Sequence, residues 1–212
     1  MGALDGITNL WAFVAAGALL NLTPGPDTFF ILGRSTAQGR RAGMLSALGI
    51  ALGSVGHTVL AAFGLSAVLA TSAMAFMVVK LMGAAYLMWL GVRMLRASGA
   101  SVAAGVATPA RAAPGKVLRE AFFTNLFNPK VALFFLAFLP QFVRPGAGAA
   151  SFLLLGFCFV ATGLVWCLIL AVMAARLGQW LKRGGVTRRL DQLCGALFVL
   201  LGVNLLFARL RH

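Results

Sequence analysis

Two short proline-containing segments interrupt long apolar stretches of this chain with polar side chains. The first reads Thr23-Pro24-Gly25-Pro26-Asp27 and the second reads Asn128-Pro129-Lys130. Ionisable groups in apolar surroundings are costly to keep unless they have a partner or a role. The carboxyl group of Asp27 and the ammonium group of Lys130 therefore mark the two segments as candidates for ligand binding or proton transfer.

The prolines predict that each segment breaks a helix, because proline lacks a backbone donor and clashes with the preceding turn. A half-helix that begins after Pro26 would offer free N–H groups, which suit a carboxylate. Half-helices that end near Leu22 or Phe127 would offer free carbonyl groups, which suit an ammonium group or another cation. A zwitterion needs both kinds of element close together. Neutral polar side chains surround these points and could bind a ligand or simply cap the broken ends: Asn21, Thr23, Thr124, Asn125 and Asn128.

Asp27 and His57 are the candidates for carrying protons. Burial favours the neutral form of a carboxyl group, whereas the nearby Lys130 favours the charged form, and the sequence leaves open which effect prevails. His57 lies inside an apolar run and could shuttle protons or could hydrogen-bond a neighbouring helix. An Asp27–Lys130 ion pair that only holds the breaks together is the structural alternative.

The composition places these segments in a membrane. The 212 residues are 61% hydrophobic and only 10% charged, with a mean hydropathy of +0.95. About a quarter of the residues of a soluble domain are charged, and disordered chains are poor in apolar residues. Both classes are therefore excluded. The net charge of +14 comes from cations in short segments between apolar runs. That placement is typical of signals for membrane orientation, so we expect contact with lipid and no nucleic-acid partner.

Six apolar runs predict an all-α integral membrane protein with six transmembrane helices, of which the first and fourth are broken. The residues between the third and fourth runs are rich in Ala, Gly, Ser and Pro, which is typical of a linker. We therefore predict repeats over residues 1–97 and 119–212, joined by a linker over residues 98–118, in one membrane domain. The runs are Leu10–Leu32, Ala42–Leu69, Ala73–Leu95, Ala121–Val143, Ser151–Ala175 and Leu190–Ala208.

The two halves carry matching short motifs. Asn21-Leu22 precedes the first break and Asn125-Leu126 precedes the second. Leu81-x-Gly83-Ala84-x-Tyr86 in the third run matches Leu193-x-Gly195-Ala196-x-Phe198 in the sixth. Because three spans are an odd number, a second copy enters the membrane the other way up. We expect two inverted repeats, with the substrate site where the broken helices meet.

Loop cations predict the orientation. Twelve of them, Arg34 among them, follow the first, third and fifth runs, and three lie on the opposite side. The positive-inside rule then puts the C-terminus in the periplasm. The N-terminus shares that side unless the first run re-enters the membrane. Gly49 and Gly53 form a small-residue face that could pack helices within one subunit or between subunits of a homo-oligomer.

The chain resembles the LysE/RhtB family of bacterial amino-acid exporters. The resemblance rests on Asn21-Leu22-Thr23-Pro24-Gly25-Pro26-Asp27, on Asn125-Leu126-Phe127-Asn128-Pro129-Lys130, and on the six-run pattern. It implies a multi-pass inner-membrane protein that exports an amino acid, driven by the proton motive force. It also implies that residues 23–27 and 128–130 serve in translocation, but it does not identify the amino acid.

Two other functions are alternatives to export by alternating access. A metal-ion exporter of similar architecture would need several carboxylate, His or Cys ligands, but Asp27 and His57 stand alone in their runs. An intramembrane enzyme would need a nucleophile with a base or paired acids on a metal, and four scattered acidic residues do not provide them. Cys158, Cys167 and Cys194 are expected to be inert buried thiols. We expect a transporter of an amino acid and protons that has no cofactor and no resident metal.

Overall fold

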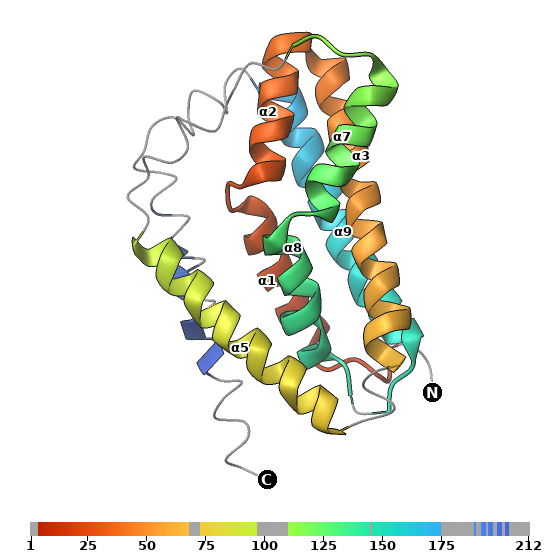
Figure 1. Ribbon diagram of the computed structural model, residues 1–212, viewed down its shortest axis with the longest axis vertical. Coiled ribbons are helices and arrows are strands. Elements are labelled where there is room, and N and C mark those ends of the chain that lie inside the picture. The colour runs from red at the N-terminus through yellow and green to blue at the C-terminus, as the bar shows by residue number, and fades with distance from the viewer. Residues whose placement is uncertain are drawn as a thin grey trace.

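The chain forms a bundle of helices, seen in Figure 1 as a computed structural model. The structure describes residues 4–67, 73–96, 110–144 and 146–174, and separate positions between 189 and 203. Within these residues there is no β-strand, only a single bridge between Ile7 and Val143. The expectation of an all-α protein is confirmed for this part of the chain.

The first apolar run is broken where the proline segment predicted. Helix α1 spans Leu10–Leu22 and helix α2 spans Pro26–Gln38. Gly25 caps α2 in an extended conformation, and Pro26 occupies the first turn, where its missing N–H costs nothing. Helix α2 continues from α1 toward the opposite end of the bundle (Figure 1).

The fourth run is broken in the same way. Helix α7 covers Pro114–Leu126, and α8 covers Pro129–Leu133. A π-helical turn η2 (Phe134–Phe138) and a 3-10 turn η3 (Leu139–Phe142) follow. The two parts of the run meet at an angle of 45°. Helix α7 begins at Pro114, within the residues predicted as a linker, because proline suits a first helical turn.

Two described helices are long and apolar enough to cross a membrane. The first joins α3 (Arg40–Val59) to the π-helical segment η1 (Leu60–Leu65), and the second is α9 (Ala149–Val172). Counting the bent pair of the fourth run as one span raises the number in the described residues to three. The sixth predicted run lies mostly outside the described residues, so the count of six spans stays a prediction.

Helix α5 (Ala73–Arg96) packs through small residues against the described positions near residue 195. A Cβ atom on Gly91 would lie 2.6 Å from the main-chain oxygen of Gly195, which is too close for any real side chain. Gly53 on α3 has the same role against α7, since its Cβ would lie 2.8 Å from that of Asn125. The small-residue contact predicted at Gly53 is therefore confirmed, and Gly91 makes a second one.

The helices of the two halves pack crosswise. Helix α1 lies against α9, and α7 lies against α3. In Figure 1 the end of α2, the start of α7 and the end of α9 lie at one end of the bundle. A phenylalanine-rich core, which includes Phe13, Phe134 and Phe138, fills the other end between α1, η2 and α9. This crosswise packing brings the two helix breaks next to each other.

Candidate functional site

The carboxylate of the first break is held by the second break. One oxygen of Asp27, Oδ2, accepts a hydrogen bond of 2.9 Å from the side-chain amide of Asn125. The same oxygen accepts a second bond of 3.0 Å from the amide of Asn128. The side-chain oxygen of Asn128 also accepts from the N–H of Lys130 and so caps α8. Two asparagines that were predicted to bind a ligand or to cap the broken ends thus orient the acid.

The ammonium of the second break is held by the first break. Nζ of Lys130 donates to the main-chain oxygen of Thr23 at 2.9 Å and to that of Leu20 at 3.1 Å. These carbonyl groups lie at the end of α1, where the break leaves helix acceptors without their usual donors. A Cβ atom on Gly25 would lie 3.3 Å from this Nζ, so glycine lets the ammonium approach the backbone. The sequence predicted that the free carbonyl groups near Leu22 attract a cation. In this structure the cation is the ammonium group of Lys130.

Asn125 connects the second break to α3. Its side-chain oxygen accepts a hydrogen bond of 3.1 Å from the hydroxyl of Ser54. Its main-chain oxygen lies 3.2 Å from Nε2 of His57, and because a carbonyl oxygen only accepts, Nε2 carries the proton. The His57 ring stacks on Phe135 with 5.6 Å between centroids. His57 therefore makes the helix-to-helix contact that was the alternative to proton shuttling.

Asn21 occupies the matching place in the first break. Its amide donates to the hydroxyl of Thr162 on α9 at 3.4 Å, as Asn125 contacts Ser54 on α3. The hydroxyl groups of Thr23 and Thr124 bond to main-chain oxygens of their own helices. Thr23 is the C-cap residue of α1, which agrees with one of the two expectations, whereas Thr124 bonds to the oxygen of Glu120 inside α7 and caps no helix end.

A cavity opens beside the paired breaks, with an empty volume of about 480 Å³ that includes its mouth. Within the described part of the chain, the second oxygen of Asp27, Oδ1, is buried and has no hydrogen-bond partner. Asp27 therefore holds beside the cavity one unpaired acceptor, closed to water in this conformation, that suits a proton or a cationic donor. Its polar wall includes Asn21, Asp27, Ser54, Asn125 and Lys130, and its apolar wall includes Leu20, Ile50, Phe159, Val160 and Leu164.

The described residues do not bring together three or more His, Cys, Asp or Glu side chains that could hold a metal ion. Cys158 and Cys167 are free thiols, and Cys167 lines the cavity. Cys194 lies outside the described side chains. Among the described residues, the site therefore has no set of ligands of the kind that a metal-ion exporter would need.

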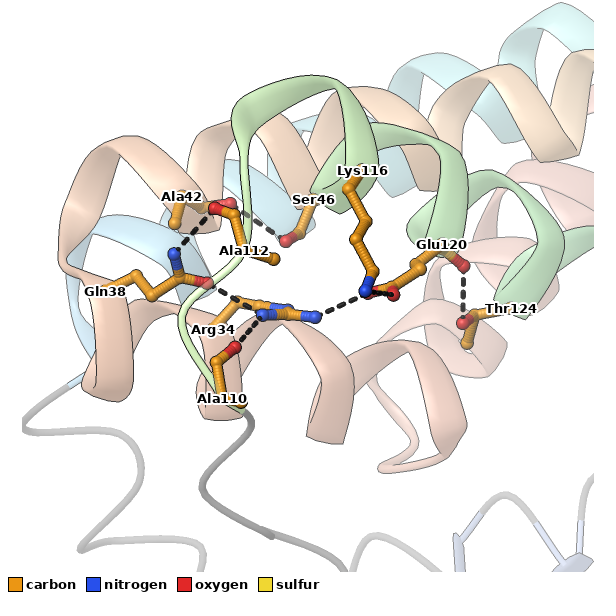
Figure 2. A network of polar contacts seen from close by, with 9 residues as sticks. All are labelled: Arg34, Gln38, Ala42, Ser46, Ala110, Ala112, Lys116, Glu120 and Thr124. Carbon is orange, nitrogen blue, oxygen red and sulfur yellow. Dashed lines mark hydrogen bonds and ion pairs between the residues drawn. The ribbon is translucent and has the colours of Figure 1, made fainter.

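Arg34 corrects the sequence interpretation, which counted it as a loop cation. Helix α2 continues past Leu32 to Gln38, so Arg34 lies within the helix and is buried. Its guanidinium pairs with Glu120 of α7 (Figure 2). The sequence spacing could have revealed this position. Arg34 follows Asp27 by seven residues, so the two side chains lie on the same face of one helix.

The chain is similar over most of its length to known membrane proteins. The family model for LysE type translocators matches residues 18–209. A homoserine/homoserine lactone efflux protein of Salmonella typhimurium is 34% identical over 201 residues, which cover 94% of this chain and 96% of that protein. A leucine efflux protein of Enterobacter sp. strain 638 is 32% identical over 205 residues, covering 94% and 95%. An uncharacterized membrane protein of Pseudomonas aeruginosa is 36% identical over 215 residues, covering 97% and 98%. No solved structure matches the chain significantly.

Proposed function

This chain belongs to the LysE family of translocators, and from that membership we propose that it exports an amino acid across the bacterial inner membrane in exchange for protons. The relatives named above by function are efflux proteins and not enzymes. Their names, homoserine and leucine, favour an uncharged side chain on the substrate. The protein is a membrane transporter in this proposal, with no catalytic residue.

One observation carries the proposal: beside the cavity, Asp27 keeps one oxygen fixed by two hydrogen bonds and the other buried and unpaired. The α-ammonium group of an amino acid is a cationic donor of the kind that the unpaired oxygen can accept. A proton on the same carboxyl group would remove the negative charge that attracts the ammonium. Substrate and proton then bind in alternation at Asp27, which is the requirement for exchange.

The apolar wall suits the substrate side chain. Ile50 of α3 and Phe159, Val160 and Leu164 of α9 face the cavity together with Asp27. An aliphatic side chain gains free energy on leaving water for such a wall, a hydroxyl costs about 1–3 kcal/mol if it stays unpaired, and a second charge costs far more. This supports a neutral amino acid over a basic or acidic one.

We further propose that two inverted repeats, residues 1–97 and 119–212 joined by the linker, alternate access to the cavity. Each broken helix packs on the second helix of the other half, and each contributes a group to the other break. This reciprocity supports an inverted pair of units. The proposed translocation residues are Asn21, Thr23, Pro24, Gly25, Pro26, Asp27, His57, Asn125, Asn128, Pro129 and Lys130. Loop cations support a periplasmic C-terminus.

The proposal is tested by export from cells that are loaded with a panel of dipeptides, with and without overexpression of the protein. We expect one free neutral amino acid to appear outside faster on overexpression, and we expect collapse of the proton gradient to abolish the difference. No acceleration across the panel, with the protein present in the membrane, would contradict amino-acid export. A metal-ion efflux assay would then be the next experiment.

A further inference from the structure

A network of polar contacts joins α2 to α7 at the end of the bundle that holds the turn between α2 and α3 (Figure 2). The guanidinium of Arg34 on α2 pairs with the carboxylate of Glu120 on α7. Its other terminal nitrogen donates to the side-chain oxygen of Gln38 at 2.7 Å and to the main-chain oxygen of Ala110 at 2.8 Å. The amide of Gln38 donates to the main-chain oxygen of Ala112 at 2.9 Å. These contacts tie the two broken helices together.

The network lies between the cavity and this end of the bundle. Arg34 follows Asp27 by seven residues on α2, which is about 10 Å along a helix that rises about 1.5 Å per residue. Glu120 precedes Asn125 by five residues on α7, which is about 7 Å. The nearby exposed cations Arg40 and Arg41 mark this end as the cytoplasmic one. A solute that passes between the cavity and the cytoplasm along α2 and α7 must therefore pass the network.

The burial of the pair suits a contact that opens and closes. The Arg34 side chain is 6% exposed and that of Glu120 is 34% exposed. A buried guanidinium needs its partner, so the contact holds the two helices together in this conformation. Because Glu120 already borders the surface, water can replace the contact without first crossing an apolar layer.

Each charge also has a second partner on its own helix. Gln38 lies one turn after Arg34 on α2 and accepts its hydrogen bond. Lys116 lies one turn before Glu120 on α7, with its Nζ 3.9 Å from a Glu120 oxygen. When α2 and α7 separate, both charges keep these partners, since pairs four residues apart face each other on a helix. The contact between the helices can therefore break without leaving either charge alone.

We propose that the Arg34–Glu120 pair is a latch that closes the cytoplasmic end of the cavity in this conformation and opens in each transport cycle. The latch rests on the proposed alternating-access function. It assigns Arg34 and Glu120 a role in positioning the two broken helices, without contact with the substrate.

Cys167 reports on the latch because its buried thiol lines the cavity. In a Cys158→Ala, Cys194→Ala background it is the only cysteine. A membrane-impermeant maleimide added to inside-out vesicles reaches it only from the cytoplasmic side. We expect Arg34→Ala to raise the labelling rate about tenfold. That factor corresponds to a loss of about 1.4 kcal/mol from the free energy that favours the closed over the open conformation. The control Arg40→Ala removes an exposed arginine at the same end and leaves the rate unchanged. Equal rates in the two variants would overturn the latch.

Three further variants distinguish opening of the latch from loss of folding. Glu120→Gln keeps the shape of the side chain and is expected to raise labelling as Arg34→Ala does. Arg34→Glu should also raise labelling, and adding Glu120→Arg should restore the slow rate, because the reversed pair can re-form. Failure of this restoration in a folded double variant would also overturn the latch. If the parent protein exports no amino acid but Arg34→Ala still exposes Cys167, the proposed function fails while the closure of this end stands.

Discussion

The side-chain amide of Asn125 donates to the carboxylate of Asp27 across the two helix breaks, with 2.9 Å between Nδ2 and Oδ2. The two residues are 98 positions apart in the sequence and belong to different halves of the chain. Ser54 and His57 of α3 fix the other acceptors of Asn125. The orientation of the acid therefore depends on an asparagine that two residues of α3 hold in place.

Replacement of Asn125 by aspartate is expected to reduce export by about tenfold or more. The substitution removes the amide donor and sets a second carboxylate beside Asp27, where like charges disfavour each other's ionised form. The matched control is Asn9→Asp, because Asn9 is exposed at the start of α1 and its side-chain oxygen can still cap that helix as an aspartate. Initial export rates from preloaded cells, normalised to the amount of protein in the membrane, measure both variants. Equal losses would contradict a specific role of Asn125 at Asp27.

Neutralising Lys130 is expected to impair export, and neutralising Asp27 as well should not restore it. Lys130→Met removes the charged donor to the main-chain oxygens of Leu20 and Thr23, and each lost hydrogen bond to a charged group costs about 1.5–3 kcal/mol. Asp27→Asn cannot replace that donor. Thermal unfolding in detergent and export rates compare the single and double variants. Recovery in the double variant would instead support a simple ion pair between the two charges.

Gly53→Ala is expected to lower the free energy of unfolding by about 1–3 kcal/mol through overpacking. The added Cβ would lie 2.8 Å from that of Asn125 and 2.9 Å from the main-chain oxygen of Phe122, and backbone cannot yield easily. Gly64→Ala is the control, because a Cβ at Gly64 meets no described atom within 4 Å. Denaturation of the purified protein measures both. An equal effect of the two substitutions would show that the contact between α3 and α7 is not tight at Gly53.

Local chemistry made the helix breaks predictable from the sequence. The prolines at positions 26 and 129 each begin a helix, and the helices before them end at Leu22 and Leu126. Small-residue packing at Gly53 followed from the GxxxG spacing for a similar reason. These features depend on a few residues that are neighbours in the chain, so they can be predicted directly from the sequence.

Pairing between distant residues was less predictable. The sequence indicated that Asp27 and Lys130 approach each other, but the asparagine donors and carbonyl acceptors that hold them depend on the crosswise packing of the halves. Arg34 was misassigned to a loop because hydropathy falls at Leu32 while helix α2 continues to Gln38. The seven-residue spacing from Asp27 indicates that Arg34 lies on the helix, whereas the average hydropathy does not.

Gradient-driven transport by Asp27→Asn in proteoliposomes tests the central claim most directly. With an acidic lumen, an antiporter should accumulate the amino acid found in the export assay as protons leave. The wild type and the control Asp5→Asn, which neutralises an exposed acid, are expected to accumulate it. The Asp27→Asn variant should fold, keep the shape of the side chain and accumulate none. Accumulation by this variant at the wild-type rate would contradict the role of Asp27 in coupling.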